Sequence, residues 1–438
     1  MRRALLISLV LLGCNERRAG TTGWAAEVPA NAVRFVKQAG PVAEKPAPVA
    51  APPTPKKPVS KVTEPTTITL WHAYRAAELE ALKQSIAAFD KLGTKITVQL
   101  RAVPYDAFND KIKVVVPEDR GPDLFIFAHD LVGAWAEMEL IEPLSSWTDV
   151  HDTDAFMPET VGALVYRNAL YGLPLDFKCV ALYYNKKLVP EPPKTLDALI
   201  ETAKKLSDGV SKYGLSYEVT NLYFHALWVH GFGGEVLDKD GKAHADSPEA
   251  KQAIELARDL VQKHKVTSRE HTTAMLSGYF NEGSAAMVLS GPWMRGEIEG
   301  VDYGVAPLPE LAPGKPARPF LGVEAVYMNR RGKHKDAAME VMRFLVSDAQ
   351  AKIRFDVGKQ PVANRAVWVG QTDPIMAAFK TQAATSVVMS SNPKMQQVWT
   401  PYNNALLAVV AGTTDPAAAL AEAQAKITEA IAQSGGGQ

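Results

Sequence analysis

Short apolar strands alternate with amphipathic helices over residues 67–139, and this alternation restricts the fold more than any other feature of the chain. The predicted strands cover residues 67–71, 96–100 and 121–127, which are rich in β-branched and aromatic residues. Residues 78–90, 108–116 and 131–139 carry apolar side chains at helical spacing. Strands joined by crossover helices form a mostly parallel sheet. The loops after the strands, residues 72–76 and 128–131, should therefore share the edge of the sheet where ligands bind.

A second strand-to-helix transition is predicted at residues 283–293, Gly-Ser-Ala-Ala-Met-Val-Leu-Ser-Gly-Pro-Trp. The apolar run 285–289 fits a strand that is buried on both faces. Ser290 or Gly291 can cap the following helix, and Pro292 fits its first turn, where no backbone N–H is needed. Trp293 then lies where a buried strand ends and a helix begins. This segment alone leaves two interpretations open, a ligand contact or a core residue.

The N-terminus carries the features of an export signal. Two arginines follow Met1, residues 4–12 are apolar apart from one serine, and Gly13 precedes Cys14. The apolar run is shorter than the ~20 residues of a membrane-spanning helix, so it fits a cleaved secretory signal. Residues 11–14, Leu-Leu-Gly-Cys, resemble the lipobox of bacterial lipoproteins, although Leu12 is larger than usual. The resemblance implies that Cys14 becomes the lipidated N-terminus; the alternative is a plain signal peptide cleaved elsewhere.

Residues 15–65 show almost no helical or strand pattern. Their centre, residues 41–58, is rich in proline, alanine and lysine. Such a sequence cannot bury enough apolar surface to order itself, so it is predicted to be a disordered tether. The formal net charge of the chain is zero, which gives no electrostatic reason to expect nucleic acid as a partner. With Cys14 modified, Cys179 is left unpaired and no disulfide is expected.

Four segments in the same order resemble the maltose/maltodextrin-binding proteins, which are sugar receptors of ABC importers. They are residues 121–130 (Gly-Pro-Asp-Leu-Phe-Ile-Phe-Ala-His-Asp), 173–195, 283–293 and 393–399. The resemblance extends from about residue 66 to the C-terminus. It implies an α/β, periplasmic-binding-protein-like fold, in which two lobes are joined by a three-crossing hinge with a ligand cleft between them. The expected lobes are residues 66–176 plus 327–372 and residues 177–326 plus 373–434.

The resemblance also implies a set of ligand-binding residues. A neutral sugar has an apolar face and a rim of hydroxyls, so its site needs aromatic rings and polar side chains. By their place in the four segments and the neighbouring loops, the candidates are Trp293, Trp399, Tyr223, Phe127, Asp130, Arg75, Lys178, Asn221, Glu324 and Asn403. Phe127 stands where the family has a tryptophan. Lys178 and Glu324 lie at crossings and are expected to pair across the closed cleft. Because Arg75 and Lys178 are cationic, an acidic sugar also remains a possible ligand.

The function implied by the resemblance is capture of a maltose/maltodextrin-type oligosaccharide by hinge closure. The closed receptor would deliver it to the transmembrane subunits of an ABC permease. It would act as a monomer in the periplasm or at the cell surface, anchored to a membrane at Cys14, without cofactor or metal. One alternative is a lipid-anchored sugar sensor or adhesin.

A second alternative is a glycan hydrolase. It would need two carboxylates on either side of a glycosidic bond, for which Asp130, Asp176 and Glu324 are candidates. The chain has no G-x-S-x-G, H-E-x-x-H or P-loop motif, so an enzyme is not expected. His225 and His230 are not at the spacing of a metal-binding pair on a helix.

Overall fold

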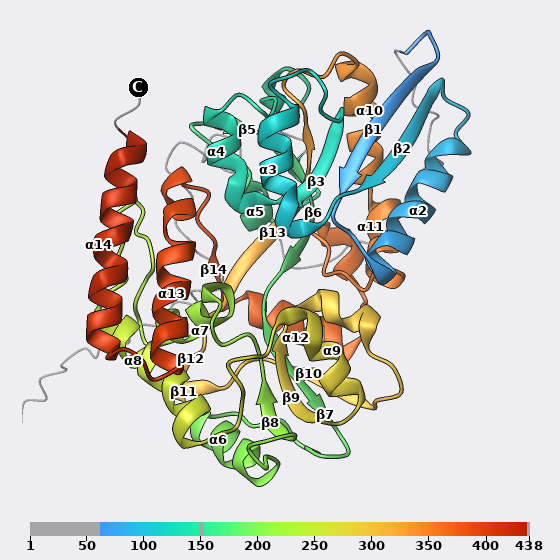
Figure 1. Ribbon diagram of the computed structural model, residues 1–438. Coiled ribbons are helices and arrows are strands. Elements are labelled where there is room, and N and C mark those ends of the chain that lie inside the picture. The colour runs from blue at the N-terminus through green and yellow to red at the C-terminus, as the bar shows by residue number, and fades with distance from the viewer. Residues whose placement is uncertain (1–61, 149–152, 436–438) are drawn as a thin grey trace, which may run out of the picture.

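The computed structural model describes residues 62–148 and 153–435 (Figure 1). The predicted signal peptide, Cys14 and the tether up to residue 61 lie outside the described residues. The described chain forms two α/β lobes, each built on its own sheet, at the top and bottom of Figure 1. The expected fold class is confirmed.

The first lobe contains a six-stranded sheet with the order β14-β13-β3-β1-β2, and β6 pairs with β13. Its centre is parallel, as predicted: β1 (Thr66–His72) pairs with β2 (Ile96–Ala102) and with β3 (Leu124–Ala128). The long strand β13 (Phe320–Met328) runs antiparallel to β3 and to β6 (Gly172–Lys178). The helices of this lobe are α2 (Ala76–Asp90), α3 (Tyr105–Val115), α4 (Val132–Glu137), α5 (Pro158–Gly162), α10 (Lys335–Leu345) and α11 (Asp348–Asp356), with 3₁₀ turns η1 (His129–Leu131), η2 (Leu144–Ser146) and η6 (Arg365–Trp368) and the small pair β4 (Val165–Tyr166) and β5 (Ala169–Leu170).

The second lobe contains a four-stranded sheet with the order β10-β7-β9-β8. All six residues of its strand β9 (Ala285–Ser290) are buried, as the apolar run predicted. The other strands are β7 (Ala181–Asn185), β8 (Tyr213–Ser216) and β10 (Tyr303–Ala306), with the hairpin β11 (Glu310–Ala312) and β12 (Lys315–Pro316). The short strand β14 (Val387–Val388) pairs with the start of β13 and so extends the six-stranded sheet toward this lobe. The helices are α6 (Leu196–Lys205), α7 (Leu222–Gly231), α8 (Pro248–Arg258), α9 (Thr273–Asn281), α12 (Pro374–Ala383), α13 (Trp399–Val410) and α14 (Pro416–Gly435), with a π-helical turn η4 (Asp259–Lys263) and 3₁₀ turns η5 (Pro292–Glu297) and η7 (Pro393–Gln397).

The chain passes between the lobes along adjacent strands. It leaves the first lobe between β6 and β7 and returns along β13, where Gly322 lies opposite Lys178. Phe320 packs in the core of the second lobe, whereas Val323 packs in the core of the first. The return therefore falls at residues 320–322, and the expected boundary at residue 327 is too late. The chain enters the second lobe again at α12.

The residue patterns also predict one strand over residues 177–184, a strand at 216–219 and one helix over 399–432, and the structure differs from each of these. The strand expected at 177–184 is interrupted between Lys178 and Ala181 where the chain changes sheet. The strand expected at 216–219 lies earlier, in β8. The single helix expected over 399–432 is two helices, because Gly412 adopts a left-handed conformation with φ +75° and Pro416 begins α14.

Among the described residues, no helix has both the length and the apolar character that crossing a membrane requires.

Candidate functional site

The ends of the parallel strands place several of the predicted side chains on one side of the first lobe. Arg75 precedes α2 just after β1, and Asp130 lies in η1 directly after β3. Because β1, β2 and β3 are parallel, their carboxyl ends share one edge of the sheet. α3 starts after β2, so Tyr105, its first residue, lies at the same edge.

The second lobe contributes a run of aromatic rings. Tyr223 of α7 lies with its ring centroid 6.2 Å from that of Trp293 in η5 and 6.3 Å from that of Phe320 in β13. Phe320 in turn lies 6.0 Å from Trp399 of α13. Tyr223, Trp293 and Trp399 are half-buried, whereas Phe320 is buried behind them. The structure therefore joins the three predicted stacking residues of this lobe in one run, in which Phe320, a residue that the sequence did not indicate, lies between Tyr223 and Trp399.

Asn221 and Asn403 use their side-chain oxygens to cap α7. Asn221 Oδ1 accepts the backbone N–H of Tyr223 at 2.9 Å, and Asn403 Oδ1 accepts that of Leu222 at 2.7 Å. The first N–H groups of a helix have no partner within the helix, which is why these oxygens are drawn to it. Both asparagines hold the end of the helix that carries Tyr223, and their role as direct ligand contacts stays a prediction.

Phe127 is not available as a stacking surface. It is 4% exposed, and the rings of Tyr105 and Phe108 stack on it, each with its centroid 4.6 Å away. The prediction from the position of the family tryptophan is therefore wrong. Tyr105 is 55% exposed and was missed, although its place directly after a strand could have pointed to it.

Lys178 and Glu324 form an ion pair, but they do so within one sheet. Lys178 Nζ lies 3.0 Å from Glu324 Oε2 and 2.8 Å from Glu78 Oε1. The two strands that carry Lys178 and Glu324 are neighbours, so the expected pairing across the cleft is corrected. Burial raises the pKa of Glu78, against the lowering effect of Lys178. Nearby carboxylates outweigh burial at Lys178 and raise its pKa well above the usual value, so it is charged.

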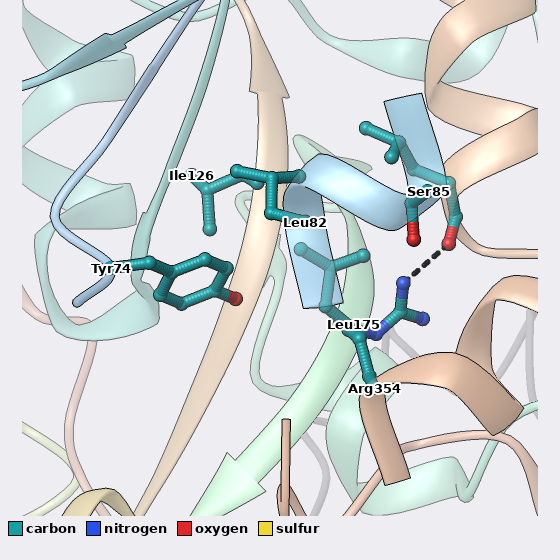
Figure 2. A pocket seen from close by; sticks show the side chains of 7 residues that line it. Tyr74, Leu82, Ser85, Ile126, Leu175 and Arg354 are labelled. Carbon is teal, nitrogen blue, oxygen red and sulfur yellow. Dashed lines mark hydrogen bonds between the residues drawn. The ribbon is translucent and has the colours of Figure 1, made fainter. Parts of the chain in front are cut away.

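A second layer of buried polar groups lies beneath this ion pair. The Tyr74 hydroxyl donates to Asp176 Oδ2 at 3.3 Å, and Gln360 Nε2 donates to the same oxygen at 2.8 Å. Arg354 and Tyr74 line a small cavity of about 10 Å³, which is far too small for a sugar (Figure 2). Burial, and then the charge of Glu324, raises the pKa of Asp176 well above its usual value.

Asp130 offers a carboxylate oxygen at the junction of the lobes. Its Oδ2 accepts a long hydrogen bond of 3.4 Å from Gln396 of η7, and Oδ1 has no hydrogen-bond partner among the described residues. Burial raises the pKa of Asp130 to about 6. Its neighbour His129 is fixed between the lobes: Nδ1 accepts from Val323 N–H at 2.9 Å, and Nε2 donates to the Met389 carbonyl at 2.8 Å. Burial lowers the pKa of His129 to about 4, so it is neutral.

Arg75 connects the two lobes directly. Its Nε lies 3.2 Å from Oε1 of Glu297, which belongs to the same 3₁₀ turn as Trp293. The backbones also approach closely here, since a Cβ added to Gly296 would lie 3.0 Å from Cβ of Ala77. The N-terminus of α2 thus contacts η5, and Arg75 already has a carboxylate partner.

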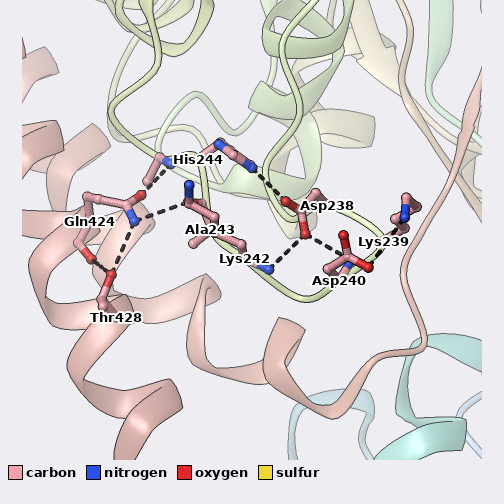
Figure 3. Close-up of polar contacts among 9 residues, drawn as sticks. Asp238, Lys239, Asp240, Lys242, Ala243, His244, Gln424 and Thr428 are labelled. Carbon is pink, nitrogen blue, oxygen red and sulfur yellow. Dashed lines mark hydrogen bonds and ion pairs between the residues drawn. The ribbon is translucent and has the colours of Figure 1, made fainter.

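One side-chain cluster has the composition of a metal site. Ligand atoms of Glu235, Asp238 and His244, in the loop after α7, lie within 4.8 Å of one another. His244 Nε2 is hydrogen-bonded to Asp238 Oδ2 at 2.9 Å, and Asp238 Oδ1 accepts two backbone N–H groups of the loop (Figure 3). The hydrogen bond from His244, followed by those from the backbone, lowers the pKa of Asp238 to about 2. These contacts account for the cluster as a means of closing the loop.

Three further histidines and Cys179 are buried groups with lowered basicity or reactivity. Burial lowers the pKa of His225 to about 3 and those of His230 and His271 to about 4. Burial also raises the pKa of the Cys179 thiol to about 12, which removes the thiolate that nucleophilic chemistry needs.

Comparison with known proteins gives consistent matches. Residues 72–352 match the family of bacterial extracellular solute-binding proteins. The maltotriose-binding protein of Pyrococcus abyssi is 30% identical, over 76% of this chain and 75% of its own length. A maltooligosaccharide ABC transporter solute-binding lipoprotein of Streptococcus pneumoniae is 27% identical, over 80% of this chain and 86% of its own. The solved structure of the maltotriose-binding protein of Thermus thermophilus, bound to maltotriose, has a TM-score of 0.77 and 29% identity, covering 83% of this chain and all of that one.

Proposed function

This chain belongs to the family of bacterial extracellular solute-binding proteins, and we propose that it is the carbohydrate receptor of an ABC importer, with a maltodextrin-type oligosaccharide as its ligand. The observation that carries the proposal is the half-buried aromatic run of Tyr223, Trp293 and Trp399, which lies at the junction with Asp130 of the other lobe. Flat rings suit the apolar faces of sugar rings, and a carboxylate suits their hydroxyls. Relatives that bind maltotriose and maltooligosaccharides support the class of ligand.

Capture works by closure of the two lobes. A ligand favours the closed arrangement only if it contacts both lobes, because equal affinity for open and closed states shifts no equilibrium. The aromatic run would take the sugar on the second lobe, and Asp130 would accept a sugar hydroxyl from the first. The adjacent strands β6 and β13 and the entry to α12 provide the hinge, since a few backbone positions at such crossings absorb the motion.

The charges of the site favour a neutral sugar over an acidic one. Lys178 is held by Glu78 and Glu324, and Arg75 is held by Glu297. An acidic sugar would have to displace these carboxylates, and it would also face the carboxyl group of Asp130. Lys178 and Arg75, the two cations that suggested an acidic ligand, are therefore already paired with carboxylates of the protein.

We further propose that the receptor acts outside the cytoplasm and is held at a membrane by lipid on Cys14. The residues before 62 would then be a cleaved signal and a tether that lets the folded body turn toward the permease. A lipoprotein among the similar importer receptors supports this arrangement. A second acyl chain would make the anchoring stable, since one chain alone binds marginally.

The proposed activity is binding without cleavage. A hydrolase needs two accessible carboxyl groups on either side of the bond. Asp176 is completely buried, and Glu324 is engaged with Lys178. Neither Asp176 nor Glu324 can therefore act as a catalytic partner of Asp130.

A thermal-shift screen tests the proposal. The panel contains maltose, maltotriose, trehalose, a cyclodextrin, a galacto-oligosaccharide and a uronic acid oligomer. A ligand that binds only the folded state raises Tm, so maltotriose is expected to raise it and the uronate to leave it unchanged. Incubation with maltodextrin should leave the chain-length distribution unchanged. A rise with the uronate alone, or release of shorter sugars, would contradict the proposal.

A further inference from the structure

Tyr105 occupies a position in the first lobe that no sequence motif marks. It begins α3 only three residues after the end of β2, and Pro104 precedes it. The carboxyl end of β2 lies beside the end of β1, which is paired to β3 on its other side. Tyr105 thus shares the sheet edge with Arg75 and Asp130, the side from which the first lobe meets the second.

The ring of Tyr105 is held in a defined orientation and is still open to solvent. It stacks on Phe127 with centroids 4.6 Å apart and an angle of 24° between the planes, and Phe127 is supported by Phe108. Even so, 55% of Tyr105 is exposed. A large aromatic ring that is fixed against the core but not covered by it presents a flat apolar surface, which is the shape a sugar ring requires.

The electrostatic surroundings of the Tyr105 hydroxyl include groups of both lobes. Burial, followed by the charges of Asp130 and Glu324 and by the Tyr223 hydroxyl, raises the pKa of Tyr105 well above its usual value. Tyr223 belongs to the aromatic run of the second lobe.

We propose that Tyr105 is the stacking residue of the first lobe, taking over the role that sequence comparison gives to Phe127. Its open ring face would cover one sugar ring and its hydroxyl would bond a sugar hydroxyl, so that the oligosaccharide lies between Tyr105 and the Tyr223–Trp293–Trp399 run when the lobes close. This proposal rests on the proposed function and names a residue that would determine affinity and closure at the same site. Phe127 then acts as the support of the Tyr105 ring.

Calorimetric titration of the full-length protein with maltotriose tests this role. Tyr105→Phe keeps the flat ring and loses only the hydrogen bond of the hydroxyl, so it should bind within about fivefold of the unchanged protein. Tyr105→Ala removes the ring and should weaken binding by about 10- to 100-fold, the range expected for a desolvated aromatic contact. Tyr105→Leu still covers Phe127 but offers no flat face, so the same loss is expected. Val114→Ala is the control, since Val114 lies on the same helix and is 57% exposed.

The outcomes separate this proposal from the proposed function. If Tyr105→Leu binds maltotriose as tightly as the unchanged protein while Trp399→Ala binds it more weakly, the role of Tyr105 is refuted and the receptor function stands. If the unchanged protein binds no glycan of the panel, both are refuted. Should Tyr105→Ala unfold, the Leu variant, whose melting temperature is measured alongside, decides the question.

Discussion

At the scale of single residues, Asp130 is the group through which pH should act on sugar binding. Burial raises the pKa of Asp130 to about 6, because ionising the buried carboxyl group costs free energy in the folded, ligand-free protein. This free-energy cost is absent at pH values below the usual pKa of an aspartate, where the group is protonated, and it is fully present above about pH 6. A sugar hydroxyl that donates to Oδ1 stabilises the ionised form and lowers this pKa. Binding should therefore strengthen as pH rises through 6.

We expect the affinity for maltotriose to be about tenfold weaker at pH 5 than at pH 7.5, since one pKa unit corresponds to a tenfold change. Calorimetry at a series of pH values measures this. Asp130→Asn, which cannot ionise, serves as the comparison and should show a flat profile. A sloping profile in that variant would assign the pH dependence to another group.

The sequence pointed to three aromatic residues whose rings lie in one run, but it did not give the orientation of two asparagine side chains. Trp293 and Trp399 of the matched segments and Tyr223 of a neighbouring loop lie in one aromatic run, because the fold brings together the strand and helix ends that carry them. The same matching could not show that Asn221 and Asn403 turn toward backbone N–H groups.

Some contacts could not be predicted because they depend on distant segments. Glu78 pairs with Lys178 a hundred positions later, and Phe320 fills the space between two predicted aromatic residues. Glu78 and Phe320 lie outside the matched segments, and a glutamate or a phenylalanine is not unusual by itself. Only the packed structure places them at the site.

At the scale of elements, the start of α7 is the support of Tyr223. Asn403→Ala removes the acceptor for Leu222 N–H, and loss of a helix cap costs about 1 kcal/mol. We therefore expect a decrease of about 1 kcal/mol in the free energy of unfolding in urea, together with weaker maltotriose binding as Tyr223 loses its fixed position. Asn404→Ala, at the exposed neighbouring position, should change neither. Equal effects from both variants would argue against the capping role.

The pair of strands β6 and β13 carries the buried ion pair of the hinge. Lys178→Met leaves Glu78 and Glu324 without a cation, and breaking a buried pair in this way costs about 3 kcal/mol or more. Adding Glu324→Gln removes one of the stranded carboxylates, so part of the lost stability should return. Urea unfolding of both single variants and the double variant measures the coupling. Additive changes in free energy would show that the two side chains are not coupled.

Element prediction succeeded where the local pattern decides the structure and failed where the tertiary context does. The alternation over residues 67–139 correctly gave β1, β2, β3 and their helices. Residues 177–184 were predicted as one strand because the apolar run is continuous, yet the chain changes sheet within it. Gly412 and Pro416 are a local signal for the break before α14. The prediction overlooked them because apolar residues recur at helical spacing on both sides of the break.

At the scale of the whole molecule, the two lobes are in contact through Arg75 and Glu297. Both side chains are partly exposed, so the pair is screened by solvent and contributes little, on the order of 0–1 kcal/mol. Arg75→Ala should thus weaken maltotriose binding by less than about fivefold. Titration at low and high salt measures the effect. A loss of a hundredfold or more would mean that Arg75 binds the ligand itself.

The two-lobe architecture followed from the family resemblance, while the exact passage between lobes did not. All nine residues of β13 are buried, so nothing in its composition marks the point where one core ends and the other begins. The passage is set by which neighbours surround each residue: Phe320 meets the second core and Val323 the first. A boundary of this kind is visible only in three dimensions.

Calorimetric titration of the Trp293→Ala/Trp399→Ala double variant with maltotriose tests the central claim most directly. Both indoles are half-buried at the junction of the lobes, and Leu407→Ala on α13, at a position 52% exposed, is the control. If the lobes close over a sugar held by these rings, the double variant should bind maltotriose at least a hundredfold more weakly, because it loses two aromatic contacts that are each worth roughly tenfold in affinity. The control variant should bind maltotriose as the unchanged protein does. Unchanged maltotriose binding in a folded double variant would contradict the account.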